Sequence, residues 1–291
     1  MRRTAWQAHR LAVNDHEMAW YETGGGQPLL FLHGSYDSLL LRPMAELFAH
    51  KHRCILYDQR GAGGSALETL DQRSLHVDRF LDDIESLRGH LGLQRVTILG
   101  HSWGATLGLL YGGRFPNRID RLVLIGMGPF SDEMHAVYHA NVLRMMDPED
   151  RPHWEQVNRR YAAGRAAGDV PRELDERNIR CWAPVMFYSR EAAERFVDEY
   201  LAAGGWRRHT PSATGFTRED VLRDAHRIDR PVMILYGYQD YEPIVQAFLL
   251  KQRIGHARLV FLNECGHMVW VDQPAQLVAA VNAFLDDGGR P

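Results

Sequence analysis

No segment narrows the possible folds of this chain as much as the pentapeptide Gly100-His101-Ser102-Trp103-Gly104. It follows the apolar run 96–99 and precedes a helical stretch over 105–111, so it predicts a strand, a sharp turn and a helix with a serine at the apex. Glycines on both sides leave room where a side chain would collide with the neighbouring strand or helix. The helix N-terminus directs its free N–H groups at the hydroxyl, where they favour negative charge. The segment indicates a nucleophilic serine, Ser102, in an α/β fold.

A serine hydroxyl needs a base, and the base needs a third group to orient it. A buried strand over 231–236 runs into a loop that contains Asp240, and the next strand, 257–262, runs into a loop that contains His267. Serine, acid and histidine then follow in the chain order that accompanies this turn. We expect Ser102 to be the nucleophile, His267 the base and Asp240 the acid.

Glu242 lies two residues after Asp240 and is the alternative acid. An oxyanion hole is expected where the apolar strand 29–32 ends in His33-Gly34-Ser35-Tyr36. Backbone N–H groups form such a hole, and the expected donors are those of Ser35 and of Trp103, directly after the nucleophile. We expect His33 and His101, which flank these donors, to be structural.

Together these residues resemble the α/β-hydrolase superfamily over nearly the whole chain. The segment 57–65, Y-D-Q-R-G-A-G-G-S, looks like the D-Q-R-G-x-G-x-S segment of the proline iminopeptidase branch, and S-W-G at 102–104 is similar to that branch's S-W-G. The resemblance implies removal of an N-terminal residue, typically proline, from peptides or arylamides. It also implies cap acids that bind the substrate's ammonium, for which Glu155 is the nearest candidate and a solvated helix carboxylate is the other interpretation. The chain departs from the branch's H-G-G-P-G at 33–37, which reads H-G-S-Y-D.

The alternation of strands and helices predicts an α/β-hydrolase fold: a mostly parallel central sheet, helices on both faces and an inserted helical cap. Amphipathic helices are expected over 73–92 and 273–285. After Met127 the alternation stops, and the sequence that follows has helical patterns and many aromatic residues. We therefore expect a core domain of residues 1–127 and 216–291 and a helical cap domain of residues 128–215. The expected strands are 17–22, 28–32, 52–57, 95–99, 121–126, 231–236 and 257–262.

A cap inserted at this point should cover the active site and choose the substrate. Its aromatic side chains predict some apolar lining, which favours a compact, fairly hydrophobic acyl group or ring. The candidate substrate-binding residues are Tyr36, Trp154, Trp182, Phe187 and Tyr188.

A dinucleotide site is the rival interpretation of Gly61-Ala-Gly-Gly-Ser-Ala66, which matches G-x-G-x-x-(G/A) after a strand. That fingerprint needs a helix that opens within the motif and an acid at the end of the next strand. Here the helix is expected to begin near Arg73, and the acids that follow lie on it, so a tight loop is favoured. Serine at position 102, in place of aspartate, also argues against the dehalogenase and epoxide-hydrolase branches.

Composition agrees with a single large α/β unit. Of 291 residues, 45% are hydrophobic and 24% charged, and the net charge of −3 gives no general attraction for nucleic acid or an anionic membrane. We expect no membrane span and no signal peptide. Three widely separated cysteines favour reduced thiols and a cytoplasmic location, and no spacing suggests a metal or another cofactor.

The expected activity is hydrolysis of an ester, amide or lactone of a small, fairly apolar substrate or a short peptide through an acyl-enzyme. Two alternatives stay open. One is a true proline iminopeptidase, and the other is a ligand sensor that keeps the fold without useful turnover. Oligomeric state cannot be read from the sequence.

Overall fold

A computed structural model describes residues 5–162, 172–203 and 213–287. Its centre is an eight-stranded sheet with the order β1-β2-β4-β3-β5-β6-β7-β8. Strand β2 pairs antiparallel with β1 and β4, and the remaining neighbours pair in parallel. The strands are β1 (Gln7–Val13), β2 (His16–Gly24), β3 (Gln27–Leu32), β4 (His52–Tyr57), β5 (Val96–His101), β6 (Ile119–Ile125), β7 (Val232–Gly237) and β8 (Arg258–Leu262). The predicted fold class is confirmed.

Strand β1 was missed by the sequence analysis, which began the sheet at residue 17. Its sequence, QAHRLAV, has no clear alternation of apolar and polar residues, and only Val13 is buried. A strand at the edge of a sheet, paired on one side only, needs no buried face of its own to form. The predicted start of the helix near residue 73 was also wrong, because α2 (Val77–His90) begins four residues later. The carboxylate of Asp71 accepts hydrogen bonds from the N–H groups of Arg73 and Ser74, which holds this segment in a turn.

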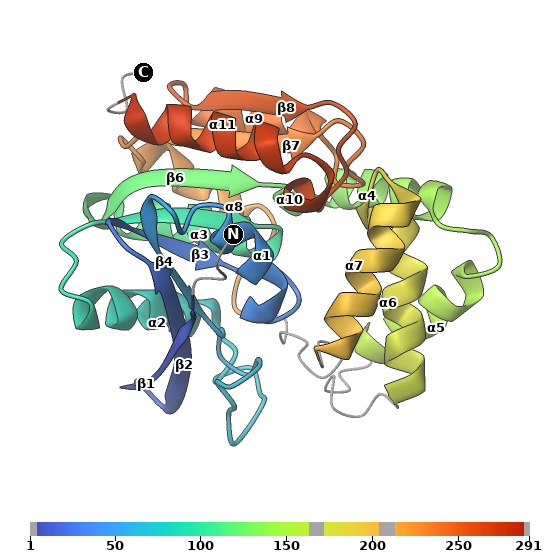
Figure 1. Cartoon of the computed structure of the whole chain (residues 1–291), viewed down its shortest axis with the longest axis horizontal. Helices are drawn as coiled ribbons and strands as arrows, with labels where there is room; N and C mark the ends of the chain where they lie inside the picture. Colours follow the sequence, from blue (N-terminus) through green and yellow to red (C-terminus); the bar gives the residue numbers. More distant parts are fainter. Residues whose placement is uncertain (1–4, 163–171, 204–212, 288–291) are drawn as a thin grey trace.

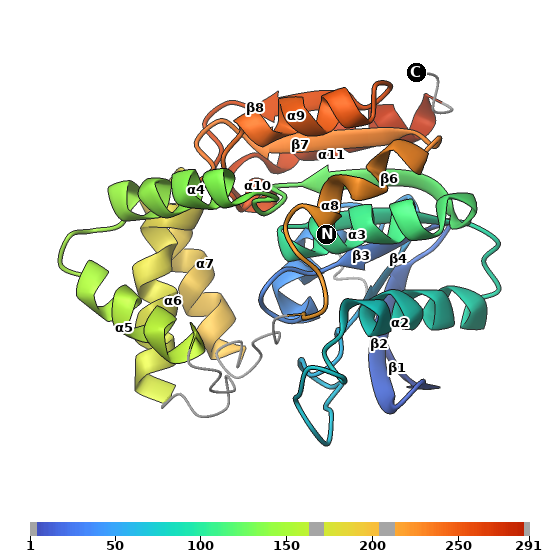
Figure 2. The ribbon, with the colours of Figure 1, turned by 180° about the vertical axis from the view of Figure 1, so that it is seen from behind.

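Helices cover both faces of the sheet (Figures 1 and 2). Alternate side chains of each central strand point to opposite faces, so Phe31 packs in one apolar cluster and Leu30 in the other. The first cluster includes α1 (Arg42–Glu46), α10 (Val269–Asp272) and α11 (Pro274–Asp286). The second includes α2, α3 (Trp103–Arg114), α8 (Asp220–Arg223) and α9 (Val245–Arg253).

In the described part of the chain, four helices between β6 and the short helix α8 form a group of their own. They are α4 (Asp132–Met145), α5 (Arg151–Ala162), α6 (Arg172–Met186) and α7 (Arg190–Ala202), and we call them the helical insertion. They gather beyond the end of the β6 arrow, to one side of the sheet (Figure 1). The exact domain boundaries stay a prediction. Within the described ranges, no helix is long and apolar enough to cross a membrane.

Candidate active site

Ser102 occupies the sharp turn between β5 and α3. Its backbone has φ 56° and ψ −124°, a left-handed conformation that few non-glycine residues adopt. The turn is packed so closely against the end of β3 that a Cβ on Gly104 would collide with the Leu32 carbonyl oxygen. The strained serine is therefore held above the carboxyl end of the sheet, at the N-terminus of α3.

Asp240 and His267 form a buried pair beside this turn. The imidazole Nδ1 lies 3.0 Å from Asp240 Oδ1 and 3.1 Å from Oδ2. Gly126, at the end of β6, makes room for the pair, because a Cβ there would lie 2.9 Å from His267 Nδ1 and 3.0 Å from Asp240 Oδ2. The Ser102 N–H donates to the carbonyl of Ile125, one residue before this glycine (2.9 Å). The turn and the pair thus meet at neighbouring strand ends, and Asp240, not Glu242, contacts the histidine.

The Ser102 hydroxyl forms no hydrogen bond to His267 in the part of the chain that the structure describes. Such contacts often tighten only when a substrate binds. The two residues are linked through His101, whose ring centroid lies 4.4 Å from that of His267 and whose Nε2 lies 3.0 Å from the His267 carbonyl oxygen. Burial and the neighbouring His267 lower the pKa of His101 well below its ordinary value, so His101 is a neutral, structural group.

The His267 loop is held by the segment that joins α6 to α7. The Met186 carbonyl accepts hydrogen bonds from the N–H groups of His267 (2.8 Å) and Met268 (3.1 Å). The Asp272 carboxylate accepts from Gly266 (2.9 Å) and Tyr188 (2.9 Å). The histidine loop is thus bonded directly to the helical insertion.

The loop after β3 supplies the expected oxyanion donors. Gln59 fixes this loop: its N–H donates to His33 Nε2 (2.9 Å), and its Nε2 donates to the His33 carbonyl (2.6 Å). The Trp103 indole donates to Gln59 Oε1 (2.9 Å), which joins the loop to the serine turn. Among the described residues, the backbone N–H groups of Ser35 and Trp103 have no acceptor. They are therefore available to a negatively charged oxygen.

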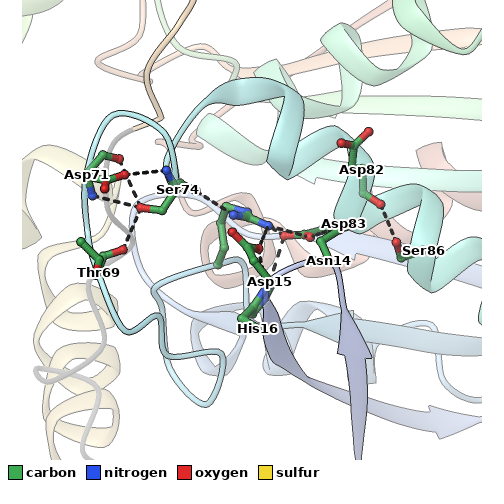
Figure 3. Close-up of polar contacts among 10 residues, drawn as sticks. Asn14, Asp15, His16, Thr69, Asp71, Ser74, Asp82, Asp83 and Ser86 are labelled. Atoms are coloured by element: carbon green, nitrogen blue, oxygen red, sulfur yellow. Dashed lines mark hydrogen bonds and ion pairs between the residues drawn. The ribbon is translucent and has the colours of Figure 1, made fainter.

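The D-Q-R-G segment is structural. Asp58 accepts hydrogen bonds from the Ser38 hydroxyl (2.6 Å) and the Gly64 N–H (2.7 Å). Arg60 is fully buried and pairs with Asp83 of α2, with Nε 2.9 Å from Oδ2. Its Nη2 also lies 3.0 Å from Asp15 Oδ1, in the group of polar contacts drawn in Figure 3. Helix α2 begins at Val77, well after the glycine motif at 61–66. The motif is therefore a tight loop and does not start a helix, as a dinucleotide site would require.

A cavity of about 790 Å³ opens beside Ser102. Its walls come from the serine turn, the start of the helical insertion, the segment before β7 and the loop after β7. It is lined by Ser35, Ser102, Trp103, Thr106, Gly128, Pro129, Asp132, His135, Tyr138, Ala213, Phe216, Thr217, Arg218, Glu219, Val221, Tyr241 and Glu242.

The five predicted substrate-binding residues are not among these lining residues. Trp154 is 2% exposed and packs edge-on against Trp182, whose ring lies behind Tyr241 at 5.4 Å. Phe187 is buried, and Tyr188 is 51% exposed. Tyr36 packs edge-on against Tyr200 (5.9 Å). Their role in substrate binding stays a prediction.

The sequence analysis missed several side chains of the cavity wall. Tyr138 and His135 lie on one face of α4, and Tyr241 and Glu242 follow the acid. Two signals were available. Tyr138 is one of the aromatic residues of the predicted cap, and Tyr241 and Glu242 directly follow Asp240, where Glu242 was weighed only as an alternative acid. Glu155, the candidate cap acid, is half-exposed and lies 3.5 Å from Arg159, as expected for a solvated carboxylate.

Known proteins resemble this chain in both sequence and structure. A family model described as alpha/beta hydrolase fold matches residues 27–274. The chain therefore belongs to the α/β-hydrolase family, and it is a hydrolase. Within that family it falls in the proline iminopeptidase branch, as the sequence motifs predicted.

A proline iminopeptidase from Xylella fastidiosa is 36% identical over 308 residues, which cover 94% of this chain and 95% of the relative. A cis-3-alkyl-4-alkyloxetan-2-one decarboxylase from Shewanella oneidensis is 22% identical over 305 residues, with 97% and 89% coverage. The structure of a proline iminopeptidase from Mycobacterium smegmatis superposes with a TM-score of 0.70 at 20% identity, covering 97% of this chain and 99% of that one. This last similarity shows the fold alone.

Proposed function

We propose that the chain is a serine hydrolase that cleaves an ester, amide or lactone bond of a small substrate through an acyl-enzyme. One observation carries the proposal. A strained serine at the head of α3 opens onto a cavity beside two unused N–H groups, and a buried Asp–His pair lies at the next strand ends. A structural turn would not need a left-handed serine at this point.

In the proposed mechanism, His267 takes the proton of Ser102 while the hydroxyl oxygen attacks the substrate carbonyl. Asp240 accepts a hydrogen bond from His267 Nδ1, so Nε2 is the atom that receives the proton. The N–H groups of Ser35 and Trp103 stabilise the oxyanion, and each contributes about 3 kcal/mol to transition-state stabilisation. His267 then protonates the leaving group. Water takes the place of that group, His267 accepts its proton as it attacks the acyl carbonyl, and the proton returns to Ser102 as the acyl group leaves.

The test is turnover of p-nitrophenyl acetate by the wild type and by Ser102→Ala. We expect the substitution to lower kcat by about 10⁶-fold, because the remaining groups act only with the nucleophile. Ser86→Ala is the matched control, since its hydroxyl donates to the Asp82 carbonyl within α2 and does not line the cavity. Hydrolysis that survives in Ser102→Ala would overturn the proposal. A wild type without multiple turnover on any acyl probe would favour a ligand sensor.

The scissile bond is the finer question. The relative from Xylella fastidiosa favours the N-terminal bond of proline, and the oxetanone-active relative favours a strained lactone. Proline p-nitroanilide, p-nitrophenyl acetate and a β-lactone, compared by kcat/KM, distinguish these possibilities. A strong preference for the proline anilide would make the chain a true proline iminopeptidase.

A further inference from the structure

An apolar patch lies at one end of the sheet, where the loop after β7, helix α9 and strand β8 come together. We call it the edge patch, and its side chains are Tyr238, Val245, Phe248, Leu249 and Phe261. The first four are 37–50% exposed. The Phe261 ring is stacked between two others, 5.3 Å from the Tyr238 ring and 5.5 Å from the Phe248 ring. Single apolar side chains on a surface are ordinary, whereas a contiguous patch of this kind marks an interaction surface.

The exposed part of the patch follows the period of a helix. Val245, Phe248 and Leu249 lie three and four residues apart on the outer face of α9. The opposite face of the same helix, which includes Ala247 and Leu250, is buried against the sheet. An apolar stripe at this spacing is the face that a helix ordinarily buries against another element. Helix α9 therefore has two apolar faces, and one of them is exposed.

Strand β8, beside this helix, is the last strand of the sheet, at the opposite end from β1 (Figures 1 and 2). On its inner side, the Leu262 carbonyl accepts a hydrogen bond from the Tyr238 N–H (2.9 Å). Backbone groups of successive strand residues point to opposite sides, so the N–H and C=O groups of Leu259 and Phe261 point away from β7. Proteins ordinarily protect such an edge with charges or proline. The sequence of β8, RLVFL, contains one charged residue and no proline.

We propose that the edge patch binds a second copy of this chain, with the two β8 strands paired antiparallel across a two-fold axis at Val260. Under this axis Leu259 of each copy lies opposite Phe261 of the other, so the outward backbone groups of both residues find partners. The axis is perpendicular to the joined sheet. Both α9 helices then lie on the same face of that sheet, and their exposed stripes meet. The patch residues do not line the cavity beside Ser102, so the inference does not depend on the proposed function.

The charges near β8 fit a second copy. The register places Arg258 opposite Leu262 of the second copy and diagonal to Glu264 of that copy. Glu264 is exposed in the turn after β8. Arg258 pairs through one nitrogen with Asp287 of its own chain, so its guanidinium keeps donors for a second carboxylate. The two-fold axis therefore brings opposite charges together at both ends of the paired strands, where like charges would repel.

The test measures the mass of the full-length chain by sedimentation velocity over about a hundredfold range of concentration, because dimerisation follows mass action. We expect a reversible dimer with twice the mass of one chain. Phe248→Glu should be monomeric over the same range, since it brings two like charges to the axis and removes them from water. Leu70→Glu is the matched control and should remain dimeric. Leu70 is an apolar side chain of similar exposure (43%) outside the patch.

A charge exchange separates loss of the contact from misfolding. Phe248→Lys should also be monomeric by itself. An equimolar mixture of Phe248→Glu and Phe248→Lys should form dimers again, because opposite charges then face each other across the axis. A variant that had failed to fold would not recover in this way. Dimers that do not return in a mixture of two folded variants, as judged by their urea unfolding, would overturn the two-fold contact at α9.

Hydrogen exchange tests the pairing of the strands. In the wild-type dimer the amides of Leu259 and Phe261 should exchange slowly, and in monomeric Phe248→Glu they should exchange fast. A dimer in which both amides exchange freely would overturn the β8 pairing. A wild type that is monomeric at every concentration, or a dimer that Phe248→Glu leaves unchanged, would overturn the inference as a whole. Aggregates without a defined mass would do the same, because they would show that the edge does not select a second copy.

Discussion

Two carboxyls on the loop after β7 have opposite surroundings. Asp240 accepts hydrogen bonds from His267 and from the N–H of Glu242 (3.0 Å), so its charge is compensated. Glu242 faces the cavity, and its buried Oε2 has no hydrogen-bond partner among the described residues. Two residues of separation along one loop therefore distinguish a carboxyl that contacts His267 from a carboxyl that faces the cavity.

Burial and the charge of Asp240 raise the pKa of Glu242, which makes a prediction for the protein without ligand. A carboxyl whose folded pKa is raised stabilises the fold fully below its unfolded pKa, and this contribution is lost as pH rises through the folded pKa. Glutamine does not titrate. Glu242→Gln should therefore gain stability relative to the wild type as pH rises above about 4.5, by at most about 1.4 kcal/mol per pH unit. Urea unfolding at pH 5, 6, 7 and 8 measures the difference, and a value independent of pH would contradict the assignment.

The positions of Ser102, Asp240 and His267 could be predicted because each follows an apolar strand, and the ends of parallel strands meet at one edge of a sheet. The wall of the cavity could not be predicted in the same way. Tyr138 lies on a helix whose exposed and buried faces depend on how the helical insertion packs over the sheet. The hydrophobic periodicity of the sequence does not predict that packing. Trp154, chosen for its aromatic character, instead packs inside the insertion.

Among the elements, the segment between α6 and α7 is bonded directly to the loop that carries His267. It bonds the histidine loop through the Met186 carbonyl and through Asp272, whose carboxylate receives N–H groups from both sides. Burial raises the pKa of Asp272, and the hydrogen bonds from Tyr188 and Gly266 oppose that shift. Asp272 is thus a positioning residue for His267.

Asp272→Asn should lower kcat by about tenfold to a hundredfold with little change in KM. The amide oxygen can replace Oδ2, which accepts from Tyr188 and Gly266, but the NH₂ group then faces the Ser189 N–H at the Oδ1 position. This contact pushes the start of α7 away from Asp272 and disturbs the backbone that holds the histidine loop. Steady-state kinetics on p-nitrophenyl acetate measure this. Asp287→Asn is the control, since its carboxylate is half-exposed and pairs with Arg258. If kcat is unchanged in Asp272→Asn, the positioning role is wrong.

The central strands could be predicted because they are buried on both faces and consist largely of apolar residues, as in the continuous apolar run Val232–Gly237. Strand β1 could not, because six of its seven residues are not buried. Its pairing is specified by the turn at Asn14, which has φ 44°, and by the backbone of β2. Edge strands of this kind leave little trace in side-chain pattern.

Across the whole molecule, Arg60 connects layers that are far apart in the chain. Its guanidinium joins the loop after β4 to Asp83 of α2, to Asp15 in the β1–β2 turn and to the Ser74 carbonyl (2.6 Å). Arg60 and Asp83 are 0% and 1% exposed. A buried pair of this kind is costly to break from one side, because the remaining charge has no solvent.

Arg60→Met should lower the free energy of unfolding by about 3–5 kcal/mol, because it leaves Asp83 buried and unpaired. The double variant Arg60→Met/Asp83→Leu should recover much of that loss, since neither charge remains. Urea unfolding of the three proteins measures both effects. A double variant no more stable than the single one would show that the guanidinium acts mainly through Asp15 and Ser74.

The hydrogen bonds that the N–H groups of His267 and Met268 donate to the Met186 carbonyl have a consequence for compounds of different size. A compound that pushes the helical insertion outward also moves the His267 imidazole, because the backbone of His267 is bonded to the insertion. If His267 is the base of the proposed mechanism, a compound too large for the cavity binds without being hydrolysed, because the movement that admits it also displaces the imidazole.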